Sequence, residues 1–209
     1  MLISEPTTTL TDYAIALETI GFAVALVKTN HCKRQQAITF WGLAFVFVAV
    51  AAILGGTCHG FANALGYDRS EILWHLMSYA LGFSSFFMLL ASVISTLPRS
   101  VRLGILGGIG LKSILYFHVI EFQNDFTYVV IDYLSAMAVV LILQLRQLIT
   151  QPNSATWIIV GIVVSGLAAT IHASRVTIAP QFNHNDIYHL IQMMALYCFY
   201  KGATLLKDQ

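Results

Sequence analysis

The sequence predicts an all-α integral membrane protein, a bundle of seven transmembrane helices forming a single domain over residues 1–209. The first observation is composition: 57% of the residues are hydrophobic and 10% are charged, whereas roughly 25% are charged in soluble domains. The second is a series of seven apolar segments, each close to the ~20 residues that cross a bilayer. The third is that the strand-like alternation of a membrane β-barrel is absent.

The seven segments run over about 13–28, 37–57, 72–95, 101–120, 126–147, 156–176 and 186–206. The second, third and sixth are uninterrupted apolar runs. The first is short and contains Glu18, and the fourth carries Lys112. Since helices and closed barrels are the structures that satisfy their backbone in lipid, each segment is expected to be a helix. The connections are short and leave no room for a soluble domain.

Loop charges predict the orientation, because cytoplasmic loops carry an excess of Lys and Arg. Basic residues flank the same side of alternate segments: Lys28, Lys33, Arg34, Arg99, Arg102, Arg146, Lys201 and Lys207. The opposite side is acidic or mixed, with Glu5, Asp12, Asp68, Arg69, Glu71, Glu121, Asp125 and Arg175. The N-terminus is therefore expected outside and the C-terminus in the cytoplasm. The stretch MLISEPTTTLTDY lacks a positive n-region, so we expect the first segment to remain in the mature protein.

Charge and cysteine content exclude some classes of function. The formal net charge is +1, which does not suit a nucleic-acid partner. The three cysteines, Cys32, Cys58 and Cys198, show no CxxC spacing and predict neither a disulfide framework nor a cysteine metal site. The sequence therefore predicts a multi-pass protein surrounded by membrane lipid. It indicates neither which membrane holds the protein nor its oligomeric state.

Six of the seven histidines lie at segment ends on the predicted extracytoplasmic side: His59, His75, His118, His172, His184 and His189. Two carboxylates, Asp132 and Glu18, lie in the outer halves of their segments. An acid in a membrane span costs at least about 2.5 kcal/mol on insertion scales, so it usually faces the bundle interior and marks a functional site. The alternative for both is a buried acid that hydrogen-bonds Tyr or Ser and fixes packing.

The last segment, QFNHNDIYHLIQMMALYCFYKG, begins with an unusual number of polar side chains. Asn185 or Asp186 is expected to be the N-cap, and Asp186 shares a helix face with His189. Gln192 lies along the edge of that face. His184 is five residues before His189, about 140° away on a continuous helix, so the two can share an ion only if His184 precedes the helix. Alternatively, Asn185 and Asp186 only cap, and nothing binds.

These residues suggest a zinc site, because catalytic zinc takes three N or O ligands and leaves a position for water. The expected ligands are His59 and His189 with either His184 or His75. Asp132, Asp186 or Glu18 is expected to orient a ligand or act as general base. Asn185, Gln192 and Thr57 are expected beside the site or its substrate.

The histidine ending the second segment and the cluster opening the seventh resemble a superfamily of seven-helix membrane metal hydrolases, often called CREST. It contains alkaline ceramidases and the progestin and adipoQ receptors. NDIYHLIQMMALYCFYKG is similar to that superfamily's H-x-x-x-H segment of the last helix. By this resemblance His59 matches the zinc ligand of the second helix, and His189 matches the second histidine of the last-helix pair.

The sequence departs from the pattern of that superfamily at three places. Asn185 stands where the first last-helix histidine is expected, with His184 offset by one. Gly55 replaces a serine four residues before His59, although Thr57 is close. The acid of the third helix has no match, and Glu71 and His75 occupy that region.

The resemblance implies zinc-dependent hydrolysis of a lipid amide or ester, in which a zinc-activated water attacks the carbonyl. Two alternatives use the same histidines without hydrolysis. A b-type haem has two axial imidazoles, here His59 with His189 or His75 with His172. A receptor or transporter would use histidine and carboxylate chains to sense or relay protons or to bind cations.

Overall fold

The computed structural model describes residues 3–123, 125–179 and 182–209. Within these residues it has seven helices, as the sequence predicts: α1 (Pro6–Lys33), α2 (Gln36–Leu65), α3 (Tyr67–Thr96), α4 (Arg99–Phe122), α5 (Phe126–Gln147), α6 (Pro152–Ala173) and α7 (His184–Thr204). In the described part of the chain, six of them, α1 to α6, are long and apolar enough to cross a membrane. The prediction of an all-helical fold suited to a membrane is confirmed.

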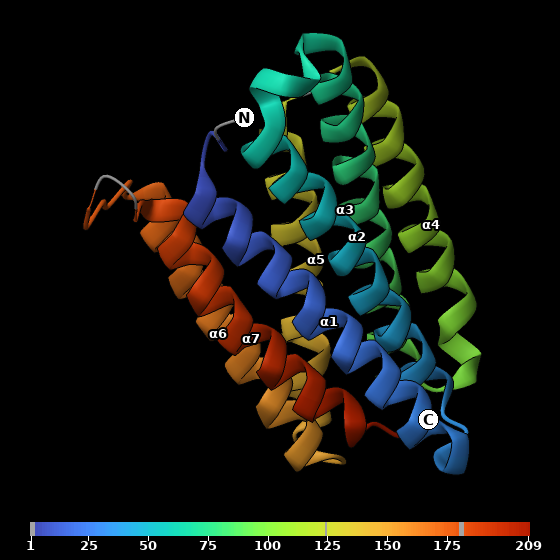
Figure 1. The fold of residues 1–209 in the computed structure, drawn as a ribbon. Helices are drawn as coiled ribbons and strands as arrows, with labels where there is room; N and C mark the ends of the chain where they lie inside the picture. Colours follow the sequence, from blue (N-terminus) through green and yellow to red (C-terminus); the bar gives the residue numbers. More distant parts are fainter. Residues whose placement is uncertain (1–2, 124, 180–181) are drawn as a thin grey trace.

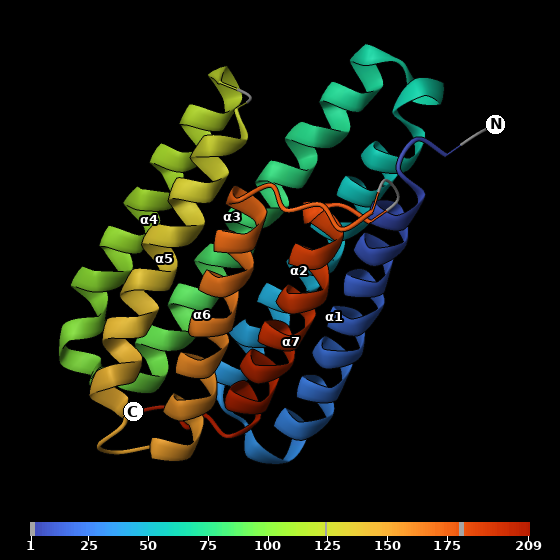
Figure 2. The same ribbon diagram turned by 90° about the vertical axis from the view of Figure 1, so that its left-hand side faces the viewer.

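The helices form a ring in the order α1, α2, α3, α5, α6, α7 and back to α1. Helix α4 lies outside the ring, against α3 and α5 (Figures 1 and 2). The N-terminus lies at one end of the bundle and the C-terminus at the other (Figure 1). Because successive helices run in opposite directions, the start of α1, the α2–α3 connection and the start of α7 meet at the N-terminal end. The residues expected at the extracytoplasmic side therefore gather there.

Local sequence signals explain where the helices begin. Pro6 and Pro152 occupy the first turns of α1 and α6, where a missing N–H costs nothing. Helix α1 thus starts about seven residues before the expected apolar segment. The expected N-cap of α7, Asn185 or Asp186, is wrong: Asn183 is the N-cap, and its side chain accepts from the Asn185 N–H at 2.8 Å. A capping box with Asp186 moves the helix start forward.

The core lies between α1, α2, α3 and α7. Its largest fully buried side chains include Phe45, Phe199, Leu26 and Leu89. The ring of Phe199 stacks on that of Trp41, with centroids 5.5 Å apart. Burial of these groups fixes α7 against α1 and α2, the helices that carry the polar residues described below.

Helices α6 and α7 approach closely at Gly202. A Cβ atom there would lie 2.5 Å from Cγ1 of Ile158 and 3.0 Å from the carbonyl oxygen of Ser154. We expect Gly202→Leu to lower the free energy of unfolding in detergent by about 1–3 kcal/mol, the cost of overpacking. The matched control is Gly166→Leu on α6, since a Cβ at Gly166 meets no described atom within 4 Å. Equal melting temperatures for the two variants would contradict this packing.

Candidate metal and acid–base site

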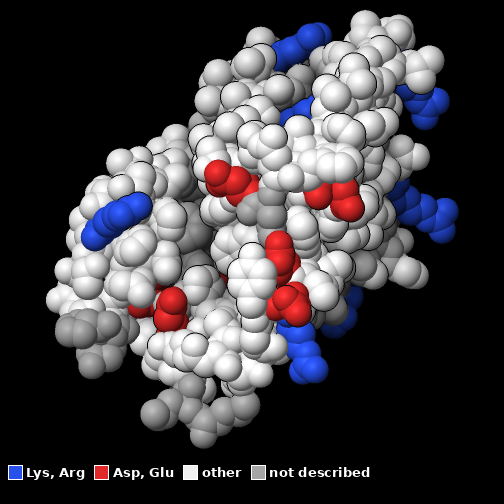
Figure 3. Space-filling model, turned by 90° about the horizontal axis from the view of Figure 1, so that it is seen from above, with Lys and Arg blue, Asp and Glu red and all other residues white. Residues whose placement is uncertain are grey.

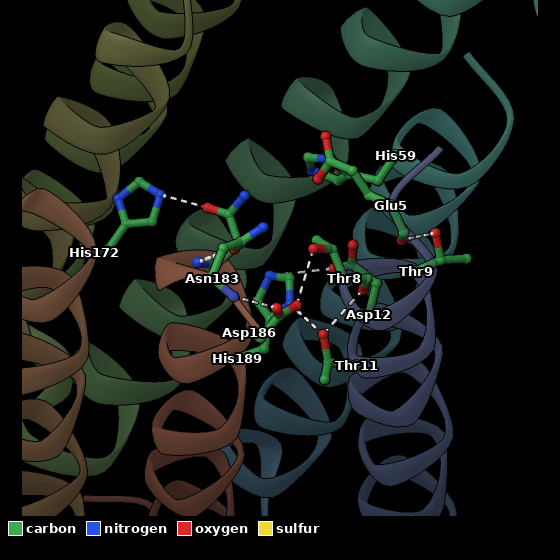
Figure 4. Close-up of polar contacts among 11 residues, drawn as sticks. Glu5, Thr8, Thr9, Thr11, Asp12, His59, His172, Asn183, Asp186 and His189 are labelled. Carbon is green, nitrogen blue, oxygen red and sulfur yellow. Dashed lines mark hydrogen bonds and ion pairs between the residues drawn. The ribbon is translucent and has the colours of Figure 1, made fainter. Parts of the chain in front are cut away.

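A cluster of polar side chains lies at the N-terminal end of the bundle, where α1, α2 and α7 meet (Figure 4). We call it the polar cluster; it consists of Glu5, Thr8, Thr11, Asp12, His59, Asp186 and His189. Seen from this end, the carboxylates lie nearer the middle of the molecule than most Lys and Arg side chains (Figure 3). The cluster is thus surrounded by acidic rather than basic groups.

His189 is held between two consecutive residues of α1. The hydroxyl oxygen of Thr11 lies 2.8 Å from its Nδ1, and Oδ1 of Asp12 lies 3.4 Å from its Nε2 (Figure 4). All three residues are buried, with Asp12 only 7% exposed. A histidine and an aspartate are therefore paired away from water.

The hydrogen bonds around Thr11 are consistent with one tautomer of His189. Thr11 has one hydroxyl hydrogen, and the carbonyl oxygen of Thr8 lies 3.0 Å away as an acceptor for it. With the hydroxyl hydrogen assigned to that carbonyl, the hydroxyl accepts from Nδ1–H of His189, and Nε2 carries a lone pair. That lone pair faces Oδ1 of Asp12, which is also an acceptor, and the buried Oδ2 of Asp12 has no hydrogen-bond partner among the described residues. This arrangement is favourable when a proton or a metal cation lies between the two groups.

Asp186 joins the start of α7 to α1. Its Oδ1 accepts from the hydroxyl of Thr8 at 2.9 Å, and its Oδ2 accepts from the backbone N–H of Asn183 at 2.7 Å. The residue is fully buried. Both oxygens of this carboxylate are thus used to hold the first turn of α7 against α1, a structural role that also fixes the position of His189 three residues later.

His59, near the end of α2, faces a different carboxylate. Its Nδ1 lies 3.1 Å from Oε2 of Glu5, which precedes α1 (Figure 4). Two residues earlier on α2, the hydroxyl of Thr57 contacts the phenol of Tyr13 at 3.1 Å. Helix α2 therefore contributes a second imidazole–carboxylate pair, on the side of the cluster nearer to water.

Two glycines of α2 let Asp12 approach this helix. A Cβ atom at Gly56 would lie 2.8 Å from Cβ of Asp12, and one at Gly55 would lie 3.9 Å from both Asp12 carboxylate oxygens. The nearest atom to a Cβ at Gly55 would be Sδ of Met77, at 3.2 Å, so Met77 and the Asp12 carboxylate both pack against this glycine.

Other histidines predicted for the site lie elsewhere. The Nε2 atom of His75 lies 3.1 Å from the carbonyl oxygen of Ile120. His184 lies within α7, not in the preceding turn, and its ring lies 5.2 Å from that of His172. His172 in turn contacts Oδ1 of Asn185 at 3.0 Å. We expected His189 to share one ion with either His184 or His75. The contacts of His184 and His75 are instead with other residues, His172 and the Ile120 carbonyl.

The predicted acids are also separated. Asp132 pairs with Lys112 of α4 (2.6 Å) and accepts from Ser85 of α3 (2.5 Å), so it belongs to a different network from the polar cluster. Glu18 faces α7 further along α1. Gln192 is buried on α7, one turn after His189. The predicted role of Asp132 and Glu18 beside the zinc ligands is not supported by these contacts.

The polar cluster contains imidazole nitrogens and carboxylate oxygens, which are suitable ligands for a divalent metal ion. Oδ2 of Asp12 is buried and has no hydrogen-bond partner among the described residues, and Oε2 of Glu5 faces Nδ1 of His59. The Nδ1 atom of His189 contacts the Thr11 hydroxyl, and metal-binding imidazoles are in general oriented by a hydrogen bond at their other nitrogen. Among the described residues, no three His, Cys, Asp or Glu side chains lie close enough together to hold a metal ion. His59 and His189 each face a different carboxylate, so sharing an ion would require His59 to leave Glu5.

The chain belongs to a family of unknown function, DUF6962, whose family model matches residues 7–208. The match covers every residue of the polar cluster except Glu5. No curated protein and no solved structure matches the chain. Family membership therefore assigns no activity, and the chemistry of the site has to be inferred from its residues.

Proposed function

We propose that this DUF6962 protein is a multi-pass membrane protein with seven spans, its N-terminus outside and its C-terminus in the cytoplasm. Helix α7 has 21 residues and packs along α6 and α1, which supports its role as the seventh span. At the C-terminal end, Lys33 donates to the carbonyl oxygen of Thr204 at 2.7 Å and Arg102 to that of Gln209. Basic side chains thus collect at this end, as expected on the cytoplasmic side.

We further propose that Asp12, His189 and His59 bind a divalent metal ion, for which zinc is the best match to N and O ligands. The observation that carries this proposal is the buried pair of acceptors formed by Nε2 of His189 and Oδ1 of Asp12. A proton would also satisfy that pair. The second imidazole, His59, and the unpartnered Oδ2 of Asp12 favour the metal ion, because a proton needs no such surplus of acceptors.

The reaction that best suits such a site is hydrolysis of an amide or ester bond in a membrane lipid. A zinc ion here would supply hydroxide at neutral pH by acidifying a water molecule. Within the chain, Thr11 orients His189, and Asp186 holds α7 in place. Glu5 is the most exposed carboxylate of the cluster, its side chain being 44% exposed, so it can accept a proton and pass it to water. We propose a distant relation to the alkaline ceramidase and adipoQ receptor superfamily on this basis.

The test is a hydrolysis assay with the full-length protein in lipid nanodiscs, loaded with zinc, against fluorogenic N-acyl and O-acyl lipids. Glu5→Gln removes the proton acceptor and keeps the shape of the side chain. We expect kcat to fall by roughly 10²–10⁴-fold, the usual contribution of a general base. The matched control is Glu71→Gln, a carboxylate at the same end of the bundle but outside the polar cluster. Failure of the zinc-loaded wild-type protein to hydrolyse either lipid class would refute the proposed reaction.

A further inference from the structure

A groove of about 310 Å³ lies between α1 and α7, lined by Glu18, Met193, Met194, Tyr197 and Cys198. The two helices run side by side in both views of the bundle (Figures 1 and 2). Glu18 is six residues after Asp12, about 9 Å along the helix, and Met193 is four residues after His189, about 6 Å. The groove therefore begins directly inward of the polar cluster, at membrane depth, and shares no residue with it.

Glu18 has an unmet hydrogen-bonding capacity in this groove. Its Oε2 atom is buried and has no hydrogen-bond partner among the described residues. A carboxyl group in a membrane span is costly, and such groups are normally paired. The bilayer core offers no water as a donor. A donor on a molecule that enters the groove from the membrane would satisfy this oxygen.

The rest of the groove is apolar and open on one side. Met194 is 65% exposed and Tyr197 is 46% exposed, so these side chains face the surrounding lipid. One turn after Glu18, the ring of Phe22 stacks on Tyr200 with centroids 4.6 Å apart. This aromatic pair joins α1 to α7 further inward than Glu18. Methionine side chains adapt readily to irregular apolar ligands.

These features favour a lipid chain over another protein helix as the occupant. A volume of about 310 Å³ lies at the lower end of ligand pockets, roughly 300–1,000 Å³, and suits a length of acyl chain. Helices that associate in membranes instead meet through small residues that let their backbones approach. The large side chains of Met193, Met194 and Tyr197 prevent such an approach here.

We propose that this groove binds the acyl chain of a membrane lipid whose hydroxyl or amide N–H, next to the first carbons of the chain, donates a hydrogen bond to Oε2 of Glu18. Binding needs no bond to break, so this inference stands apart from the proposed hydrolysis. The hydrogen bond supplies the recognition, and the methionine and tyrosine side chains supply contact along the chain.

The test uses photo-crosslinking in nanodiscs with a diazirine-bearing monoacylglycerol and its dimethyl ether, which has the same chain and no donor. We expect the parent probe to label the peptide that contains Met193 and Cys198, and the ether to label it much less. Glu18→Leu should reduce labelling by the parent probe by roughly tenfold or more, since a hydrogen bond to a charged group contributes at least that factor. Glu18→Gln keeps a carbonyl acceptor and should retain more labelling than Glu18→Leu.

Three further variants complete the test. Met193→Trp should fill the groove and abolish labelling, while Val27→Trp, at an exposed position on α1 outside the groove, should not. Asp12→Asn lies in the polar cluster, so it should lose hydrolysis and keep labelling, which separates this inference from the proposed function. Equal labelling by the two probes, or full labelling of Glu18→Leu, would overturn the inference.

Discussion

Replacing Asp132 by leucine is expected to lower the free energy of unfolding in detergent by about 3–5 kcal/mol, the cost of removing one partner of a buried ion pair. Asp132 is 7% exposed and its Oδ1 lies 2.6 Å from Nζ of Lys112. Without Asp132, the ammonium group of Lys112 remains inside a candidate span with no carboxylate beside it. Thermal or denaturant unfolding of the purified variant measures the loss.

A double-mutant cycle shows whether the effect comes from the pair. Lys112→Met with Asp132→Leu removes both charges, and we expect it to be close to the wild-type stability or above it, because apolar residues replace a buried pair without the desolvation cost. Ser85→Ala removes the donor to Oδ2 of Asp132 and should cost about 1.5–3 kcal/mol, the usual contribution of a hydrogen bond to a charged group. An Asp132→Leu variant as stable as the wild-type protein would contradict the pairing.

Replacing either His189 or Asp12 by alanine is expected to remove the bound metal ion from the purified protein. At the proposed site His189 would supply Nε2 and Asp12 a carboxylate oxygen, so each variant deletes one of the few proposed ligands. Thr11→Val deletes the hydroxyl that holds Nδ1 of His189 and keeps the shape of the side chain. Because a group that hydrogen-bonds a metal-binding imidazole fixes its orientation and raises its basicity, we expect metal affinity to weaken by about 10–100-fold in this variant. Metal titration of the chelator-treated proteins measures both effects.

The structure itself supplies matched controls for this prediction. His75 and His184 were expected among the ligands from the sequence, but their rings contact the Ile120 carbonyl and His172. Their alanine variants are therefore expected to bind metal as the wild-type protein does. His31, near the C-terminal end of α1, is a third control. Loss of metal in His75→Ala with full retention in His189→Ala would assign the site to the other histidines.

The fold follows from the sequence because lipid imposes a simple rule on it. Each span must be apolar over a length of about 20 residues, and every expected segment lies within or largely overlaps one helix. The rule does not fix helix ends, which depend on capping. The first helix was expected to start near residue 13 but starts at Pro6, because the threonine-rich stretch looks like a polar loop when only hydropathy is considered.

That early start is why Asp12 and Thr11 were not among the expected site residues. A signal was present: Glu5, Thr8 and Asp12 are spaced by three and four residues, the spacing of one helical face. On a helix they form a polar stripe, which contacts His59 of α2 and the first turns of α7. The pairing of Lys112 with Asp132 could also have been predicted from the sequence, because one base and one acid on successive spans are expected to pair. The rotation of each helix about its axis depends on packing between helices, so hydropathy alone does not give it.

Elemental analysis of the detergent-purified wild-type protein measures whether the polar cluster of α1, α2 and α7 binds a metal ion, as we propose. A visible absorption spectrum of the same sample excludes or reveals haem. We expect about one zinc ion per chain, as at a catalytic site with N and O ligands, and no Soret band. Protein that folds, contains no metal and takes up none when zinc is added would contradict this proposal, as would a stoichiometric Soret band.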